Sequence, residues 1–221
     1  MKIHIVERLA YFRELESRLR GVRLLGSDVR PYADADIGLR AVAADFLHPV
    51  QTYVSRRRID ELTRLRAAIW ETCREDMLRL FEIIRFRVEG EDGIRAVAPP
   101  IVVWSREQVV PFCPQDDHVL LPSPPITLDL PIIADGMHRC WMARESGVEP
   151  VVLTVSGVKP ETPYYAYPSS WTAVEVLPTV PEEKHKRKRH RVKNHYSLYR
   201  DYSSLGSTGP RHPGEIAAAR P

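Results

Sequence analysis

The chain has 221 residues, of which 43% are hydrophobic, enough to bury a core, and its formal net charge at pH 7 is +3. Its longest apolar runs are far shorter than the roughly 18 residues that a membrane span requires, and residues 1–20 contain no hydrophobic signal segment. We therefore expect a cytoplasmic protein without a membrane partner, whose three cysteines, Cys73, Cys113 and Cys140, are free thiols in a reducing compartment.

The first part of the chain has mostly helical periodicity. Apolar residues recur every three or four positions over residues 4–20, and Gly21 ends the pattern. The same spacing predicts three further helices: over residues 36–47, from about Arg58 onward, and over residues 75–86. The sequence EGEDG that follows is typical of a turn.

From about residue 94 the sequence has the pattern of short strands. Runs of β-branched residues, bounded by prolines and polar turns, occur at residues 94–104, 108–125, 128–134, 150–158 and 172–176. A helix over residues 138–146, ended by Gly147, interrupts them. Within the second stretch, a cation site is one interpretation of Asp116, Asp117 and His118, but a polar turn explains them more simply. Together these elements predict an α+β fold.

A charged turn joins the expected strand at residues 128–134 to the helix after it. Asp135, Gly136, His138 and Arg139 stand where the strand ends. The first turn of a helix presents free backbone N–H groups and the positive end of the helix dipole, so it binds anions. Gly136 permits a tight backbone, and His138 and Arg139 add hydrogen-bond donors. Asp135 can cap the helix, orient Arg139, bind a cation or accept a proton, and the turn by itself is also explained as an ordinary polar turn.

Three stretches together, RIDELTRLRAAIW, APPIVVWS and LPIIADGMHRCWMARESGVEPVVLTV, resemble the ParB/sulfiredoxin superfamily. The resemblance covers roughly residues 49–158 and is sharpest over residues 131–153. It implies a small mixed sheet with packed helices, in which the strand–turn–helix unit binds nucleotide phosphates. The residues that the resemblance assigns to phosphate are Gly136, His138 and Arg139. By the same resemblance, Asp135 would lie beside the reacting phosphoryl group or its metal, Mg²⁺.

The branches of this superfamily differ at the turn. Sulfiredoxins carry a catalytic cysteine directly before the His-Arg pair, but this chain has Met137 there and Cys140 on the other side. Partition-type ParB proteins have a Gly-Glu-Arg-Arg type of turn and a following helix-turn-helix domain, neither of which is apparent. The form Asp-Gly-x-His-Arg resembles the free serine kinases, which transfer a phosphoryl group from a nucleotide to an amino-acid hydroxyl. Their glutamate base corresponds to Gln51, which cannot take a proton. Either Asp60 or Glu61 substitutes for it, the correspondence is shifted, or the chain does not catalyse that reaction.

A basic segment follows the expected core. Residues 184–193, KHKRKRHRVK, carry seven Lys or Arg and no acid, and without them 25 basic residues face 29 acidic ones, a net charge of −4. The segment either binds nucleic acid or is a solvated charge run. The apolar pattern of the next stretch, NHYSLYRDYSSL, indicates a segment that docks on the domain, and if it docks near the turn, Lys193, His195 and Arg200 would add charge to the phosphate site. Trp171 would either wall a small-molecule pocket or pack on the edge of the core.

These features divide the chain into an N-terminal helical extension, a ParB/sulfiredoxin-like core, an aromatic and basic segment packed on it, and a flexible tail. The corresponding ranges are residues 1–48, 49–158, 159–203 and 204–221. The expected function is a nucleotide-dependent phosphotransferase acting on a small hydroxyl-bearing metabolite. Asp135 and His138 would be catalytic, ATP or ADP (or CTP) the nucleotide, and Asp135 a ligand of Mg²⁺. The expected auxiliary residues are Gln51, Trp171, Lys193 and Arg200. The alternative is a non-catalytic ParB-like regulator that binds a nucleotide, or nucleic acid through residues 184–193.

Overall fold

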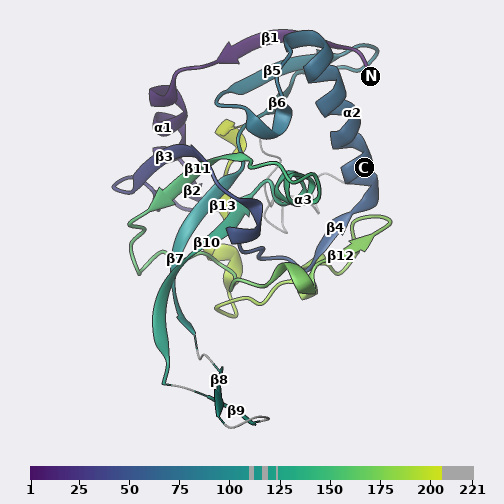
Figure 1. Cartoon of the computed structure of the whole chain (residues 1–221). Coiled ribbons are helices and arrows are strands. Elements are labelled where there is room, and N and C mark those ends of the chain that lie inside the picture. The colour runs from purple at the N-terminus through teal and green to yellow at the C-terminus, as the bar shows by residue number, and fades with distance from the viewer. Residues whose placement is uncertain (110–111, 116–118, 123, 206–221) are drawn as a thin grey trace.

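A computed structural model describes residues 1–109, 112–115, 119–122 and 124–205 of the chain, and only the backbone of 112–115 and 119–122. The fold combines helices with several small sheets, as the α+β expectation requires (Figure 1). Within these residues, no helix is both long and apolar enough to cross a membrane.

The central sheet has four strands in the order β10-β7-β11-β3. Their bounds are Asp36–Ala41 for β3, Ile101–Val109 for β7, Ile126–Asp135 for β10 and Val151–Ser156 for β11. The strand β11 pairs with β7 in parallel and with β3 in antiparallel fashion, while β10 and β7 are antiparallel. The sheet is therefore mixed, and the helix α3 (Met137–Glu145) connects β10 to β11.

A second sheet and the longest helix pack against the central sheet. The second sheet contains β1 (Ile3–Leu9), β5 (Ile83–Val88) and β6 (Arg95–Val97) in the order β1-β5-β6, and the helix is α2 (Arg56–Cys73). Side chains of both pack with α3 into one hydrophobic cluster. A second cluster contains residues of α1 (Phe12–Arg20) and several buried tyrosines from the C-terminal part of the chain.

The central strands separate these two clusters because successive side chains of a strand point to opposite faces. In β11, Val152 belongs to the first cluster and Leu153 to the second, and both side chains are fully buried. A strand buried on both faces reads as a continuous apolar run, which is how VVLTV appears in the sequence.

Three further pairs of short strands complete the sheets. They are β2 (Arg23–Leu24) with β13 (Arg200–Asp201), β4 (Tyr53–Ser55) with β12 (Glu175–Leu177), and β8 (Phe112–Gln115) with β9 (Val119–Pro122). The short 3₁₀ helices are Ala44–Phe46, Met77–Arg79, Trp171–Ala173, Lys184–Arg187, His195–Leu198 and Ser203–Leu205. The outer parts of β7 and β10 form a two-stranded ribbon that projects from the body toward β8 and β9 (Figure 1).

The expected helices before residue 90 are only partly correct. The helix predicted over residues 4–20 is β1 followed by α1, the one predicted over 36–47 is β3 with a 3₁₀ turn, and the one over 75–86 is a 3₁₀ turn followed by β5. Helix α2 is confirmed and begins two residues before Arg58. The N-terminal part is thus not purely helical, because β1 pairs with β5 and β3 with β11.

The later elements agree better with the sequence pattern. Strands are present in all five expected stretches, and α3 ends at Glu145, just before Gly147. Asp116, Asp117 and His118, and the tail beyond residue 205, lie outside the described residues.

Candidate functional site

The start of α3 is built around a glycine that no other residue replaces without strain. The pairing of β10 with β7 shifts register between Ile133 and Asp135, and the chain then turns through Gly136, whose φ is +84°. A Cβ on Gly136 would lie 2.8 Å from Cβ of Pro100 and 2.9 Å from Nη2 of Arg139. The left-handed backbone and the lack of space both require glycine at this turn.

Arg139 is a buried cation at this helix start. Its side chain is 11% exposed, and Nη2 lies 3.4 Å from Oδ2 of Asp135. Its Nη1 is buried and has no hydrogen-bond partner within the described structure. Burial lowers the pKa of Arg139, while the charge of Asp135 raises it. A buried guanidinium nitrogen without a hydrogen-bond acceptor costs free energy. An anion at the helix start would supply the missing acceptor.

His138 connects the start of α3 to the start of α2. Its Nε2 accepts a hydrogen bond of 2.9 Å from the backbone N–H of Ser55, so the proton of the neutral ring is on Nδ1. Burial, with a further contribution from the charge of Arg58, lowers the pKa of His138 to about 4. The imidazole is therefore neutral at pH 7 and poor as a proton-transfer group.

An open hollow lies at the start of α2, beside Ser55. It has a volume of about 390 Å³ and is lined by Ser55, Arg57, Arg58, Glu61, Thr179 and Val180. The Oγ of Ser55 caps the helix by accepting from the N–H of Arg58 at 3.4 Å, and the carbonyl of Pro178 accepts from the N–H of Arg57 at 3.2 Å. An ion pair of 2.7 Å joins Arg58 to Glu61. The hollow therefore presents both signs of charge.

Buried tyrosines of the second hydrophobic cluster pack next to the turn. The hydroxyl of Tyr164 donates to the carbonyl of Ala134 at 2.8 Å, one residue before Asp135. The hydroxyls of Tyr32 and Tyr202 are 2.7 Å apart. Burial raises the pKa of Tyr202 well above its usual value, and the charge of Asp135 adds to the shift. These rings fix the end of β10 from the side of the second cluster.

The expected auxiliary residues lie in different surroundings. Gln51 is half-buried and donates to the carbonyl of Tyr53 at 2.9 Å, in the segment that leads to Ser55. Trp171 donates to the carbonyl of Ala44 at 3.0 Å and packs against the first cluster. Lys193 is exposed.

Arg200 approaches the turn only through a tyrosine. It is 1% exposed, and its guanidinium donates to the carbonyls of Leu198 and Thr162 and lies 5.1 Å from the ring centroid of Tyr164. The structure thus brings together the four residues of the turn and places Arg200 behind them.

The described residues offer no ready-made metal cage. Within them, no group of three or more His, Cys, Asp or Glu side chains is placed to hold an ion. Asp135 is the carboxylate of the turn, and its side chain is 29% exposed.

Cys73 and Cys140 are free thiols, and burial raises the pKa of Cys140 to about 12, which makes this thiol inert.

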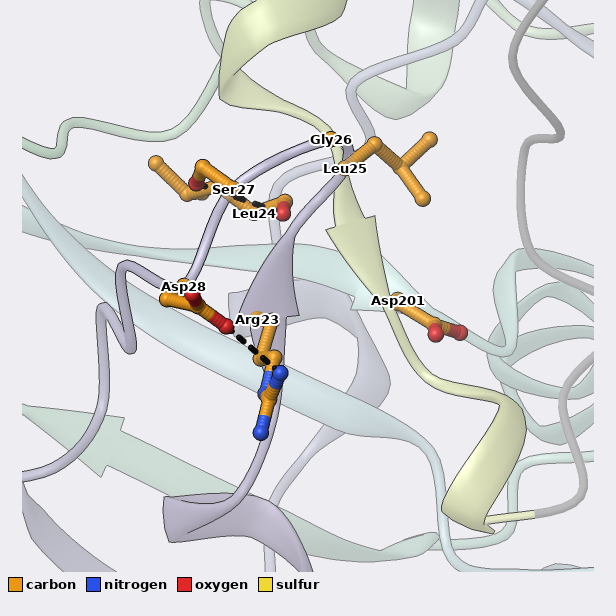
Figure 2. A pocket seen from close by; sticks show the side chains of 7 residues that line it. All are labelled: Arg23, Leu24, Leu25, Gly26, Ser27, Asp28 and Asp201. Atoms are coloured by element: carbon orange, nitrogen blue, oxygen red, sulfur yellow. Dashed lines mark hydrogen bonds and ion pairs between the residues drawn. The ribbon is translucent and has the colours of Figure 1, made fainter.

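A second hollow lies on the other side of the fold, between the turn after β2 and the strand β13. Figure 2 shows the side chains that line it: Arg23, Leu24, Leu25, Gly26, Ser27, Asp28 and Asp201. An ion pair of 2.7 Å joins Arg23 to Asp28, and Asp201 adds a further carboxylate to the lining. We assign no function to this hollow.

Two parts of the site were missed by sequence reasoning. Ser55 begins α2 with an N-cap signature, Ser-Arg-Arg-Arg before an apolar periodic run, which would have placed the helix start correctly. Tyr164 carries no local signal, because its partner Ala134 is 30 residues away in the sequence.

Comparison with known proteins agrees with the sequence resemblance at the level of the family. The ParB CE domain matches residues 14–112 and 128–177, which is more than half of the chain. No curated protein and no solved structure matches the chain. The matched residues include α2, β10 from Leu128 onward, the turn at Asp135–Arg139 and α3. The chain therefore belongs to the family of the ParB CE domain.

Proposed function

We propose that the start of α3 binds the phosphate groups of a nucleotide and that the protein is a nucleotide-dependent phosphotransferase. The observation that carries this proposal is the buried Arg139, whose Nη1 has no hydrogen-bond partner within the described structure, at a helix start opened by Gly136. Nucleotide phosphates supply the charge and the acceptor oxygens that this guanidinium needs. The membership in a ParB-like family is consistent with a nucleotide ligand.

The acceptor of the phosphoryl group would be a small hydroxyl-bearing metabolite in the hollow beside Ser55. The hollow is connected to the phosphate site through the hydrogen bond between Ser55 and His138. In the transfer, a phosphoanhydride P–O bond of the nucleotide breaks, the substrate oxygen bonds to phosphorus, and the hydroxyl proton passes to a carboxylate. Asp135 at the turn and Glu61 in the hollow are the two candidates for that proton.

The neutral His138 supports the proposal as a positioning group. Because its pKa is low and its Nε2 already accepts a hydrogen bond, His138 orients the starts of α2 and α3 and does not transfer a proton in this proposal. Its Nδ1–H donates in the neutral ring, as a phosphate or substrate oxygen requires.

Mg²⁺ is compatible with this site but would need the nucleotide to complete its ligands. Asp135 is the residue that would hold it, since Mg²⁺ commonly binds through one or two carboxylates together with substrate phosphates. When bound, the ion would neutralise charge on the transferring phosphoryl group.

A binding screen tests the nucleotide. We expect one of ATP, ADP, CTP or GTP, with Mg²⁺, to raise the melting temperature by about 5–10 °C at a concentration of 100 times Kd. Arg139→Met should abolish this shift. The matched control is Arg144→Met in the last turn of the same helix, whose guanidinium pairs with Asp45 at 2.6 Å. An Arg139→Met protein that is folded and still shifts like wild type would exclude the proposed site.

A turnover assay separates the enzyme from a non-catalytic regulator that uses the same phosphate site. Asp135→Asn should retain the nucleotide-dependent rise in melting temperature. It should no longer transfer the phosphoryl group to a hydroxyl acceptor. Glu61→Gln shows which carboxylate takes the proton. A wild-type protein that binds nucleotide and shows no transfer to any hydroxyl metabolite would instead support the regulator.

A further inference from the structure

The basic segment at residues 184–193 lies along the body of the protein. Its backbone pairs in the antiparallel sense with residues 165–167. On its other side, the backbone N–H of Thr52 donates to the carbonyl of Arg187 at 3.0 Å. These main-chain bonds hold the segment in place, so its cations are presented at defined positions.

The seven Lys and Arg side chains of this segment fall into two groups. Three are neutralised by carboxylates: Lys186 by Glu183, Arg187 by Glu175, and Arg191 by Glu107. The other four have no carboxylate partner in the part of the chain that the structure describes: Lys184, Lys188, Arg189 and Lys193. These four are the available cations: Lys184, Arg189 and Lys193 are exposed, and Lys188 is half-buried, with its Nζ donating to the hydroxyl of Tyr165 at 2.6 Å.

Aromatic rings lie directly beside the available cations. Tyr167 is 38% exposed, and the guanidinium carbons of Arg189 and Arg191 lie 5.5 Å and 4.4 Å from its ring centroid. Nζ of Lys188 lies 5.0 Å from the ring centroid of Tyr165, but this ring is buried, so Tyr167 is the ring of the two that an external base can reach. Guanidinium planes and tyrosine rings next to cations are the groups on which unpaired nucleic-acid bases stack.

This surface borders the phosphate site. Thr52 contacts the basic segment and Ser55 contacts His138. Ser55 follows Thr52 by three positions, a rise of roughly 10 Å in extended chain. Arg56, exposed at the first position of α2, directly follows Ser55 and adds a cation there.

We infer that Lys184, Lys188, Arg189 and Lys193, with Tyr167, form a binding surface for single-stranded nucleic acid. The four cations contact backbone phosphates, and a base stacks on the ring of Tyr167 and the plane of Arg189. The surface favours an unpaired strand because the bases of a duplex do not offer their faces to such groups. It goes beyond the proposed phosphotransferase, since binding of a strand needs neither a nucleotide nor turnover.

Anisotropy of a fluorescently labelled 12-nucleotide single strand tests the surface with the full chain and no nucleotide. We expect binding whose log Kd changes with log[salt] with a slope of about 3 in magnitude, as four released counterions on a single strand require. Replacing the four available cations by alanine should weaken binding more than tenfold and remove most of the salt dependence. Tyr167→Ala should weaken it about tenfold, and Tyr167→Leu, which keeps apolar bulk without the ring, should do the same.

The matched control removes the same charge elsewhere. Arg13, Arg30, Arg64 and Arg87 are all exposed, and their joint replacement by alanine should leave Kd within about twofold. An equal loss in this control would overturn the inference, because net charge alone would then explain binding. Tighter binding of a duplex, or of vesicles rich in acidic lipid, would also overturn it. Arg139→Met, which tests the phosphotransferase, should leave strand binding unchanged, so the two proposals can fail separately.

Discussion

At the scale of single residues, the site depends on buried polar groups that each have one specific partner. His138 accepts from Ser55, and Arg139 has Asp135 on one side and an unused donor on the other. Buried groups of this kind are costly unless they are satisfied, and they are retained where they orient or bind something. The turn is therefore a place where ligand binding and folding stability are coupled.

The low pKa of His138 makes stability depend on pH. An unfolded histidine titrates near pH 6.5, whereas folded His138 titrates at about 4, so the unfolded state binds the additional proton between these values. Stability is full above pH 6.5 and falls as the pH drops toward 4, by an amount on the order of 2–3 kcal/mol. Urea unfolding of wild type and His138→Gln at pH 7.5 and 5 checks this expectation.

His190→Gln tests a second histidine that contributes to this pH dependence. Burial also lowers the pKa of His190, in the basic segment, to about 4, and the centroid of this ring lies 3.6 Å from that of His195, with the ring planes tilted by 40°. Each substitution should remove part of the pH dependence independently. If the wild type and His138→Gln lose equal stability between the two pH values, His138 is not the titrating group.

At the scale of elements, helices and strands differed in how well their residues reveal them. The sequence of α2 carries its own cap in Ser55 and an apolar periodicity. Helix α3 has no side-chain cap, and its bounds follow from the Asp-Gly turn before it and Gly147 after it. Both helices were predicted. The segments β1 and β5 were predicted as helix because IHIVERL and IIRFRV mix apolar and charged residues in ways that fit both periods. Each becomes a strand by pairing with the other, and they are about 80 residues apart, a constraint that a local pattern does not contain.

The ribbon formed by β7 and β10 is an element held by one buried ion pair. Glu107 is 5% exposed and pairs with Arg191, which also donates to the carbonyl of Tyr164 at 2.7 Å. A two-stranded ribbon alone is marginally stable, so this pair anchors the ribbon to the basic segment.

Removing one partner of this pair should cost more than removing both. Arg191→Met leaves the carboxylate of Glu107 buried without a cation, and we expect a loss of about 3–5 kcal/mol in the free energy of unfolding. The double variant Glu107→Leu/Arg191→Met should recover a substantial part of that loss. A double-mutant cycle by urea denaturation measures both values, and additive single losses would contradict the role of the pair.

At the scale of the whole molecule, the sheet joins parts of the chain that the sequence separates. The strand β3, from the first 48 residues, forms one edge of the central sheet beside β11. The expected core at residues 49–158 therefore shares its sheet with the expected extension. The candidate turn was visible in the sequence because its residues are contiguous, whereas Ser55 and Tyr164 reach it only through the assembled fold.

Deletion tests the predicted division at residue 48. A chain of residues 49–221 lacks β3 and β1, which uncovers the edge of β11 and one side of β5. We expect it to aggregate or to unfold without a cooperative transition, as followed by size-exclusion chromatography and circular dichroism. A monomeric shortened chain that melts cooperatively would show that the first 48 residues are dispensable for the core.

The pairing of β3 with β11 also sets an order of events during synthesis. The register joins Asp36 to Ser156, 120 residues later in the chain. At roughly 5–20 residues per second, β3 leaves the ribosome on the order of ten seconds before its partner is complete. During that interval the apolar side chains of Ile37 and Leu39 have no strand beside them. A chain refolding from denaturant, in which both strands are present from the start, has no such waiting time.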